Sequence, residues 1–316
     1  MDRNVLIITG MHRSGTSLMT NLIQSGGLHI GDNLLKPNRT NRHGFFEDVD
    51  FWSFQDQILK KRGFNDLSIP EETIHWTDEE INKAKDIINS KSAVAFWGWK
   101  DPRTCLFLNQ WFSLLPEAKF VFVFRHPLYV LLSLIYAVPV SRDPMLVIHG
   151  WYVYNKHILD FYKANRQRSI LCHISGVIRD IEKFREIVKT KFGFDMQLNL
   201  EQIYHPIELK DMPINSFITQ YMMSEYKPVY DLYQQLQGEA DLSFYETGKT
   251  NIKDDIKLLN YAIEASLFLY NAILEKYEHL RRSRVLAMVD AIYKYPIVGR
   301  LLTSIFNTLS KVWYGK

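Results

Sequence analysis

An apolar strand that leads into a glycine-containing loop and then an apolar helix is the feature that most restricts the fold of this chain. Val5–Ile8 (VLII) predicts a buried strand, Gly10–Ser17 (GMHRSGTS) follows it, and Leu18–Ile23 predicts a helix. This order points backbone N–H groups and a helix N-terminus towards a bound phosphate. The alternative is an ordinary strand-to-helix turn rich in small residues.

The loop differs from the phosphate loop of nucleotide triphosphatases in one informative way. Gly10 and Gly15 have the spacing of G-x-x-x-x-G-K-[ST], but Thr16 stands where that pattern has lysine, and Arg13 lies two positions before Gly15. The usual lysine reaches the β- and γ-phosphates beside Mg²⁺. We therefore predict a metal-free phosphate site formed by the following loop residues: Gly10, His12, Arg13, Ser14, Gly15, Thr16 and Ser17.

A second anion site is predicted after another strand. Phe120–Phe124 (FVFVF) ends in Arg125-His126-Pro127, and Ser133 lies eight residues beyond Arg125 on the helix that Pro127 begins. Arg125 is then at the carboxyl end of a strand, where ligands of open α/β sheets bind. A guanidinium and a hydroxyl on rigid elements suit a second phosphate. The alternative is a salt bridge made by Arg125, with Ser133 only packing.

Alternation of strands and helices predicts an α/β fold: a three-layer sandwich of the P-loop type with a central parallel sheet. The predicted strands are Val5–Ile8, Val94–Trp97, Phe120–Phe124 and, more weakly, Ser169–His173. The predicted helices are Ser17–Gln24, Val49–Arg62, Asp78–Ser90, Arg103–Phe112, Leu128–Tyr136, Val177–Lys191, Tyr226–Gln237 and Ile252–Leu280.

Two domains follow from this pattern: residues 1–280, with a motif-bearing core at 1–195 and a helical remainder at 196–280, and a basic extension at 281–316. The extension has seven Lys or Arg residues and one acid, Asp290, a net charge of +6. Its apolar face and basic flanks are typical of a helix at a membrane interface. The alternative is a helix docked on the domain or on a second subunit of a homodimer.

Composition favours an intracellular enzyme. The chain has two cysteines, Cys105 and Cys172, each in an apolar run, which indicates buried thiols in a reducing compartment. No segment resembles a secretory signal or reaches the roughly 18 apolar residues of a membrane span. We expect a cytoplasmic location, with possible attachment to the inner face of the membrane through 281–316. The local basic charge is not a nucleic-acid footprint, so no nucleic-acid partner is expected.

The two anion motifs together resemble the family of sulfotransferases that use 3′-phosphoadenosine 5′-phosphosulfate (PAPS). Gly10–Ser17 is similar to the family's 5′-phosphosulfate loop, and Arg125 with Ser133 is similar to its 3′-phosphate pair. The resemblance covers roughly residues 1–195 and implies a P-loop-type fold with PAPS as donor. We find no match to the C-terminal Arg-Lys-Gly loop of the cytosolic steroid and phenol branch.

Two further segments resemble the bacterial carbohydrate and tyrosylprotein branch. Asn41–Asp48 (NRHGFFED) is similar to a segment whose glutamate is the general base, which implies that role for Glu47. Trp99–Arg103 (WKDPR) is similar to an element whose lysine stabilises the transferring group, which implies that role for Lys100. Arg13 is the second expected catalytic cation. The aromatic pair Phe45–Phe46 is expected to desolvate the carboxylate and so strengthen it as a base.

Several alternatives remain for these residues. Asp48 could be the base in place of Glu47, or either acid could simply favour a helix N-terminus. His43 is another candidate base, and His12 and His126 either contact the nucleotide or only pack. Finally, Asp101 and Arg103 could simply pair with each other or with a neighbouring residue.

The expected reaction is in-line transfer of a sulfuryl group to a hydroxyl, most simply of a carbohydrate. A kinase or NTPase, a non-catalytic nucleotide-binding protein, and a tyrosine- or phenol-directed sulfotransferase are the competing interpretations. Loops 63–78 and 138–145 are expected to set acceptor specificity, but their sequences do not indicate which acceptor they bind. No His, Cys or Asp cluster has metal-ligand spacing, so no metal is expected.

Overall fold

The computed structural model describes residues 4–37, 44–91, 94–137, 144–198, 200–203 and 226–245. The chain divides into two units, 1–265 and 266–316, and every described residue belongs to the first. The predicted boundary at residue 280, the helix Ile252–Leu280 and the basic extension therefore lie outside the described residues. Among the helices that the structure describes, none is long and apolar enough to cross a membrane.

Four parallel strands form the central sheet in the order β2-β1-β3-β4. They are β1 (Asn4–Thr9), β2 (Phe96–Lys100), β3 (Lys119–Phe124) and β4 (Ser169–His173). The prediction of an α/β fold around a parallel sheet is confirmed. Because β1 is a central strand, the loop that follows it lies at the middle of the sheet's carboxyl edge.

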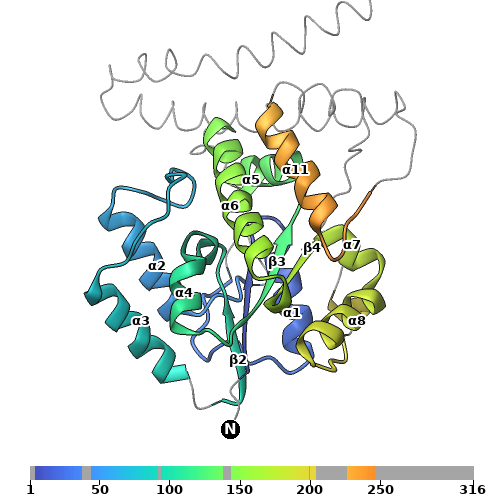
Figure 1. Cartoon of the computed structure of the whole chain (residues 1–316), viewed down its shortest axis with the longest axis horizontal. Coiled ribbons are helices and arrows are strands. Elements are labelled where there is room, and N and C mark those ends of the chain that lie inside the picture. Colours follow the sequence, from blue (N-terminus) through green and yellow to red (C-terminus); the bar gives the residue numbers. More distant parts are fainter. Residues whose placement is uncertain are drawn as a thin grey trace, which may run out of the picture. The chain divides into compact units, whose positions relative to one another are not determined.

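Helices cover both faces of the sheet (Figure 1). Those of the first half are α1 (Thr16–Ser25), α2 (Val49–Lys61), α3 (Asp78–Lys91), the 3-10 helix η1 (Pro102–Phe107), α4 (Leu108–Leu114) and α5 (Pro127–Ala137). Those of the second half are α6 (Pro144–Ala164), the 3-10 helix η2 (Arg166–Arg168), α7 (Ile174–Arg179), α8 (Ile181–Phe192), α9 (Leu200–Ile203) and α11 (Lys227–Glu239).

Alternate residues of each strand enter two separate cores, as the twofold period of a strand requires. On β3, Phe120, Phe122 and Phe124 pack with α2, η1, α4, α6 and α11. Val121 and Val123 point to the other face and pack with α1, α7 and α8. The strands are therefore apolar on both faces, which is the pattern of a sheet covered on both sides.

Three predicted boundaries are wrong. The strand predicted at Val94–Trp97 is β2 and begins at Phe96, because Val94 is exposed and the strand extends to the buried Lys100. The predicted helix Arg103–Phe112 is divided into η1 and α4. The predicted helix Val177–Lys191 is divided at Asp180, whose side chain caps α8 by accepting a hydrogen bond from the amide of Lys183.

The sequence pattern missed α6 altogether. This helix of 21 residues packs against α5, α11 and η1. Its buried residues include Val147, Trp151, Val153 and Ile158. Half-buried or exposed residues form a narrow stripe along one side, at spacings of three and four: His149, Tyr152, Lys156, Asp160 and Lys163. The helical period is therefore present in the sequence but was overlooked.

Candidate active site

The glycine loop packs against the ends of β3 and β4, and both of its glycines are required there. A Cβ atom on Gly10 would lie 2.0 Å from the carbonyl oxygen of Val123. Gly15 has a φ of +92°, and its Cβ would lie 2.5 Å from Cγ1 of Ile174. Side chains at these positions would separate the loop from the sheet, so the two glycines fix its path.

The N-terminus of α1 is left open for an anion. Gly15 is the N-cap, no side chain caps the helix, and its first turn has no acid. The hydroxyl of Ser14 is buried and has no hydrogen-bond partner among the described residues. Thr16 is buried at the helix start, and its carbonyl accepts a hydrogen bond from Thr20. An orphaned hydroxyl beside uncapped amides fits a phosphate group.

Arg13 joins the loop to the predicted second anion site. It has a φ of +68°, a left-handed conformation that is uncommon for a residue with a side chain. Its Nε donates a hydrogen bond of 2.9 Å to Oγ of Ser133 on α5. The glycine loop and the helix after β3 are therefore in direct contact.

Arg125 is held beside α5 by an aromatic ring. Its guanidinium carbon lies 4.8 Å from the centre of the Tyr129 ring, and its backbone carbonyl accepts a hydrogen bond from Nε1 of Trp151. Ser133 contacts Arg13, and no hydrogen bond between Ser133 and Arg125 is seen in the part of the chain that the structure describes. Sequence reasoning missed Tyr129. Its spacing of four residues from Arg125 is one helical turn and could have revealed it.

Both histidines near the predicted anion sites contact aromatic rings. His126 is buried, its Nδ1 accepts a hydrogen bond from the amide of Leu128, and its ring packs edge-on against Tyr233. Burial and the charge of Arg125 lower the pKa of His126 to about 3, so the ring is neutral at pH 7. His12 packs edge-on against Tyr154, with its Nε2 3.9 Å from a carboxylate oxygen of Asp66.

Lys100 connects the phosphate loop to the predicted base. It is buried at the carboxyl end of β2, beside Ile8 of β1. Its Nζ lies 2.8 Å from Oε1 of Glu47 and 3.4 Å from Oγ of Ser17 in the first turn of α1. The same Nζ donates to the carbonyl of Phe45 at 2.8 Å, a backbone contact that the sequence did not predict. One ammonium group thus bridges the helix N-terminus and a carboxylate.

The segment that carries Glu47 has an unusual backbone. Gly44 has a φ of +95° and Phe46 has a φ of +56°. Two left-handed residues so close together turn the chain so that Glu47 is buried next to Lys100. Phe45 and Phe46 are both partly buried beside it. His43 lies outside the described residues.

Asp48 has a structural role. Its side chain accepts a hydrogen bond from the amide of Asp50 and so caps α2. Its other oxygen pairs with Nζ of Lys91 at 2.8 Å. Both carboxylate oxygens are thus engaged, which leaves Glu47 as the better placed of the two acids to take a proton.

Asp101 and Arg103 do pair with each other. Oδ1 of Asp101 accepts hydrogen bonds from the backbone amide of Arg103 at 2.8 Å and from its Nη1 at 3.2 Å. The same Nη1 lies 4.0 Å from Oε2 of Glu47. Arg103 was not predicted to be a site residue, although its place in the sequence Lys-Asp-Pro-Arg is next to one.

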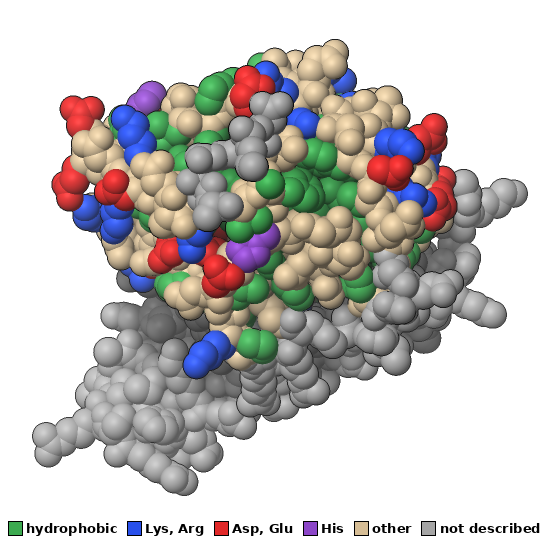
Figure 2. Space-filling model, turned by 90° about the horizontal axis from the view of Figure 1, so that it is seen from below, with side chains coloured by type: hydrophobic (Ala, Val, Ile, Leu, Met, Phe, Trp, Pro, Cys, Tyr) green, Lys and Arg blue, Asp and Glu red, His purple; other side chains and the backbone are tan. Residues whose placement is uncertain are grey.

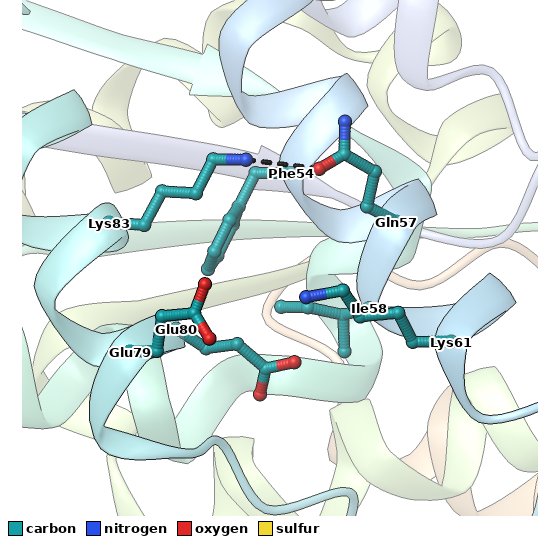
Figure 3. A pocket seen from close by; sticks show the side chains of 7 residues that line it. All are labelled: Phe54, Gln57, Ile58, Lys61, Glu79, Glu80 and Lys83. Atoms are coloured by element: carbon teal, nitrogen blue, oxygen red, sulfur yellow. Dashed lines mark hydrogen bonds between the residues drawn. The ribbon is translucent and has the colours of Figure 1, made fainter.

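Two cavities lie away from these residues. One, of about 40 Å³, is between α2 and α3, where Nζ of Lys83 donates to Oε1 of Gln57 at 3.0 Å (Figure 3). The other, of about 280 Å³, is lined by residues of η1, α4, α6 and the segment at 71–73. Neither contains a predicted site residue. Among the described side chains, no group of three or more His, Cys, Asp or Glu could hold a metal ion.

Charge on the face below the sheet in Figure 1 is mixed. Figure 2 shows this face with acidic and basic side chains near each other towards its rim and apolar side chains between them. Arg13, Lys100 and Arg125 lie instead at or just after the carboxyl ends of β1, β2 and β3.

A family model and two solved structures, all of sulfotransferases, are similar to this chain. A model of the sulfotransferase family matches residues 6–164. The chain is similar to the sulfotransferase domain of the Synechococcus PCC 7002 olefin synthase, with 14% identity and a TM-score of 0.45 over 78% of this chain and 96% of that one. It is also similar to the sulfotransferase STF9 of Mycobacterium avium, with 13% identity and a TM-score of 0.42 over 73% of this chain and 78% of that one. No curated protein sequence matches the chain.

Proposed function

The chain belongs to the sulfotransferase family, and on that premise we propose that it transfers the sulfuryl group of PAPS to a hydroxyl of a carbohydrate, with Glu47 as general base. The observation that carries the proposal is the double contact of Lys100. Its ammonium group lies against both Ser17, in the first turn of α1, and the carboxylate of Glu47. The predicted phosphate loop and the proposed base therefore share one cation, which supports the proposal.

The donor site draws on residues of two loops. The uncapped N-terminus of α1, the buried hydroxyl of Ser14 and the hydroxyls of Thr16 and Ser17 suit the 5′-phosphate. Gly10, His12 and Gly15 complete that loop. Arg125 and Ser133 would hold the 3′-phosphate, which distinguishes PAPS from simpler sulfate donors. Since Arg13 donates to Ser133, the two phosphate sites would be coupled.

The reaction requires one bond to form, one to break and one proton to move. The acceptor oxygen bonds to sulfur as the bond between sulfur and the 5′-phosphate oxygen breaks, which leaves adenosine 3′,5′-bisphosphate. The acceptor's hydroxyl proton goes to the carboxylate of Glu47. Negative charge grows on the departing phosphate oxygen, and Lys100 and Arg13 are the cations placed to stabilise it.

The carbohydrate acceptor rests on the similarity of the Asn41–Asp48 segment to the bacterial carbohydrate and tyrosylprotein branch. The partly buried rings of Phe45 and Phe46 next to Glu47 would provide an apolar surface for a sugar ring. A phenolic or tyrosine hydroxyl is the alternative on the same residues. We place the reaction in the cytoplasm, because Cys105 and Cys172 are buried and free, which suits a reducing compartment.

Calorimetry of the purified chain tests the donor assignment. Adenosine 3′,5′-bisphosphate should bind more tightly than AMP or ATP, and Arg125→Ala should remove that preference. A charge-assisted contact to phosphate contributes about 1.5–3 kcal/mol, so a loss of tenfold or more is expected. Indifference to the 3′-phosphate, or Mg²⁺-dependent preference for ATP, would favour a kinase or NTPase. Formation of the bisphosphate from PAPS in the presence of oligosaccharides and phenols then identifies the acceptor class.

A further inference from the structure

Four charged groups lie together at the start of η1. Glu47, Lys100, Asp101 and Arg103 are all buried, and Asp101 is 0% exposed. Two are acids and two are bases, so the cluster has no formal net charge. Buried charges are tolerated when they are paired in this way, and removal of one leaves another uncompensated.

The two carboxylate oxygens of Glu47 have different environments. Oε1 accepts a hydrogen bond of 2.8 Å from Lys100. Oε2 accepts no hydrogen bond from the residues that the structure describes, and Nη1 of Arg103 lies 4.0 Å from it. That distance is too long for a hydrogen bond but short enough for electrostatic attraction. Oε2 therefore keeps its lone pairs open.

Arg103 is held in place by contacts that do not involve Glu47. Asp101 accepts from both its backbone amide and its Nη1. Its guanidinium carbon also lies 5.8 Å from the ring centre of Trp52 on α2. Because Asp101 caps η1 as well, the position of the guanidinium is fixed by the backbone of that helix.

We infer that Arg103, held by Asp101, is a positioning residue that orients the carboxylate of Glu47, so that Oε2, the oxygen beside Arg103, takes the acceptor's proton. The inference rests on the proposed function, since it assumes that Glu47 is the base. It assigns the proton to a particular oxygen atom. It also gives Asp101 and Arg103, at the start of η1, a role in the reaction.

The charges around Arg103 balance within the cluster. Arg103 faces Glu47, Asp101, Tyr154 and Asp66, and Lys100 contacts Glu47 through the other carboxylate oxygen. Removal of the guanidinium therefore takes one cation away from Glu47. Removal of the Asp101 carboxylate takes away the group that holds the guanidinium in place.

The experiment measures kcat and KM for adenosine 3′,5′-bisphosphate formation from PAPS by the full chain, with chitotriose and with water alone as acceptor. Arg103→Met should lower kcat by about tenfold to a hundredfold, with the KM for PAPS retained, because misplaced groups lose this much. Asp101→Asn should lower kcat in the same direction, because the guanidinium of Arg103 then loses its carboxylate partner. Asp101→Asn keeps an oxygen that can cap η1. Arg103→Lys retains the charge and should recover part of the rate.

Arg62→Met is the matched control. Arg62 makes a two-contact ion pair with Glu80 at 2.9 and 2.8 Å, between α2 and α3 and outside the cluster. Its loss should leave kcat in place. If Glu47→Gln stays active, the proposed function fails. If Glu47→Gln is inactive but Arg103→Met and Asp101→Asn keep the wild-type kcat, or Arg103→Lys recovers none of the lost rate, only the positioning role fails.

Discussion

The Nε atom of Arg13 donates a hydrogen bond of 2.9 Å to the hydroxyl of Ser133, across 120 residues of sequence. The two residues belong to different predicted anion sites, one in the glycine loop and one on α5. Because they are in contact, the binding contributions of the two sites should depend on each other.

We predict that Ser133→Ala weakens binding of adenosine 3′,5′-bisphosphate by about tenfold and leaves that of AMP within about twofold. The double variant with Arg13→Ala should lose less than the product of the two single losses, since both remove one shared interaction. Calorimetry on the four proteins measures this. Ser113→Ala is the control, because that hydroxyl donates only to the carbonyl of Gln110 on α4. Fully additive losses would contradict the coupling.

The two loop glycines should be required for folding. Gly10→Ala sets a methyl group against the backbone oxygen of Val123, which a rigid strand cannot move away, and should lower the free energy of unfolding by about 3 kcal/mol. Gly15→Ala adds left-handed strain to a clash with Ile174. Gly238→Ala on α11 meets nothing within 4 Å and should stabilise by about 0.5–1 kcal/mol. Thermal unfolding compares the three, and equal melting temperatures would contradict this account.

Local sequence patterns predicted most of the strands and helices. The strands at β1, β3 and β4 and the helices α1, α2, α3, α5 and α11 follow from short apolar runs and from helical periods, which are properties of neighbouring residues. The glycine loop was readable for the same reason. In contrast, α6 was missed because its polar stripe of His149, Lys156 and Asp160 is narrow and is interrupted by Tyr152, so the helical period is weak.

Long-range contacts at the site could not be predicted. The sequence identified Glu47 and Lys100 separately, by resemblance. These residues are 53 positions apart in the sequence, and they come into contact because β1 pairs with β2, which puts Lys100 beside Ile8. The contact between Arg103 and Glu47 depends on the same pairing. No local rule encodes a strand order, so a pairing of this kind follows only from the assembled sheet.

Mutation should distinguish the role of Glu47 in catalysis from the role of Asp48 in stability. Glu47→Gln removes the proposed base and should lower PAPS turnover by about 10²–10⁴-fold while it leaves donor binding nearly unchanged. Asp48→Ala removes the cap of α2 and the partner of Lys91, so it should lower stability by at least about 1–2 kcal/mol with turnover of the folded protein within severalfold. Initial rates normalised to bisphosphate-binding sites distinguish the two. The reverse pattern would make Asp48 the base.

The basic extension 281–316 should bind anionic membranes. Its net charge of +6 and its apolar residues between Ile297 and Trp313 together favour adsorption at a lipid surface. The full chain should sediment with vesicles that contain phosphatidylglycerol, and a chain ending at Leu280 should not. Salt at about 0.5 M should weaken the binding, because it screens the charges. Equal recovery of both proteins in the pellet would instead favour docking on the domain or on a second subunit.

Acid should destabilise the fold through its buried histidines, and His126 provides the clearest test. Burial and Arg125 lower the pKa of His126 to about 3, against about 6.5 in an unfolded chain. The unfolded state therefore binds the extra proton between these values, so this contribution to stability is complete above pH 6.5 and is lost as the pH falls towards 3. Each such group contributes a slope of at most about 1.4 kcal/mol per pH unit.

His126→Asn should reduce that slope. The amide oxygen of asparagine can still accept from the amide of Leu128, but the side chain does not titrate. His173, whose pKa is lowered to about 3 chiefly by burial, would keep its own contribution. Burial raises the pKa of Asp101 to about 6, which acts with the opposite sign, since the folded state then holds the proton more tightly. Both effects are common to the two proteins, so the difference between their urea-unfolding free energies from pH 4 to 7 isolates His126, and parallel curves would show that its ring is not kept neutral by the fold.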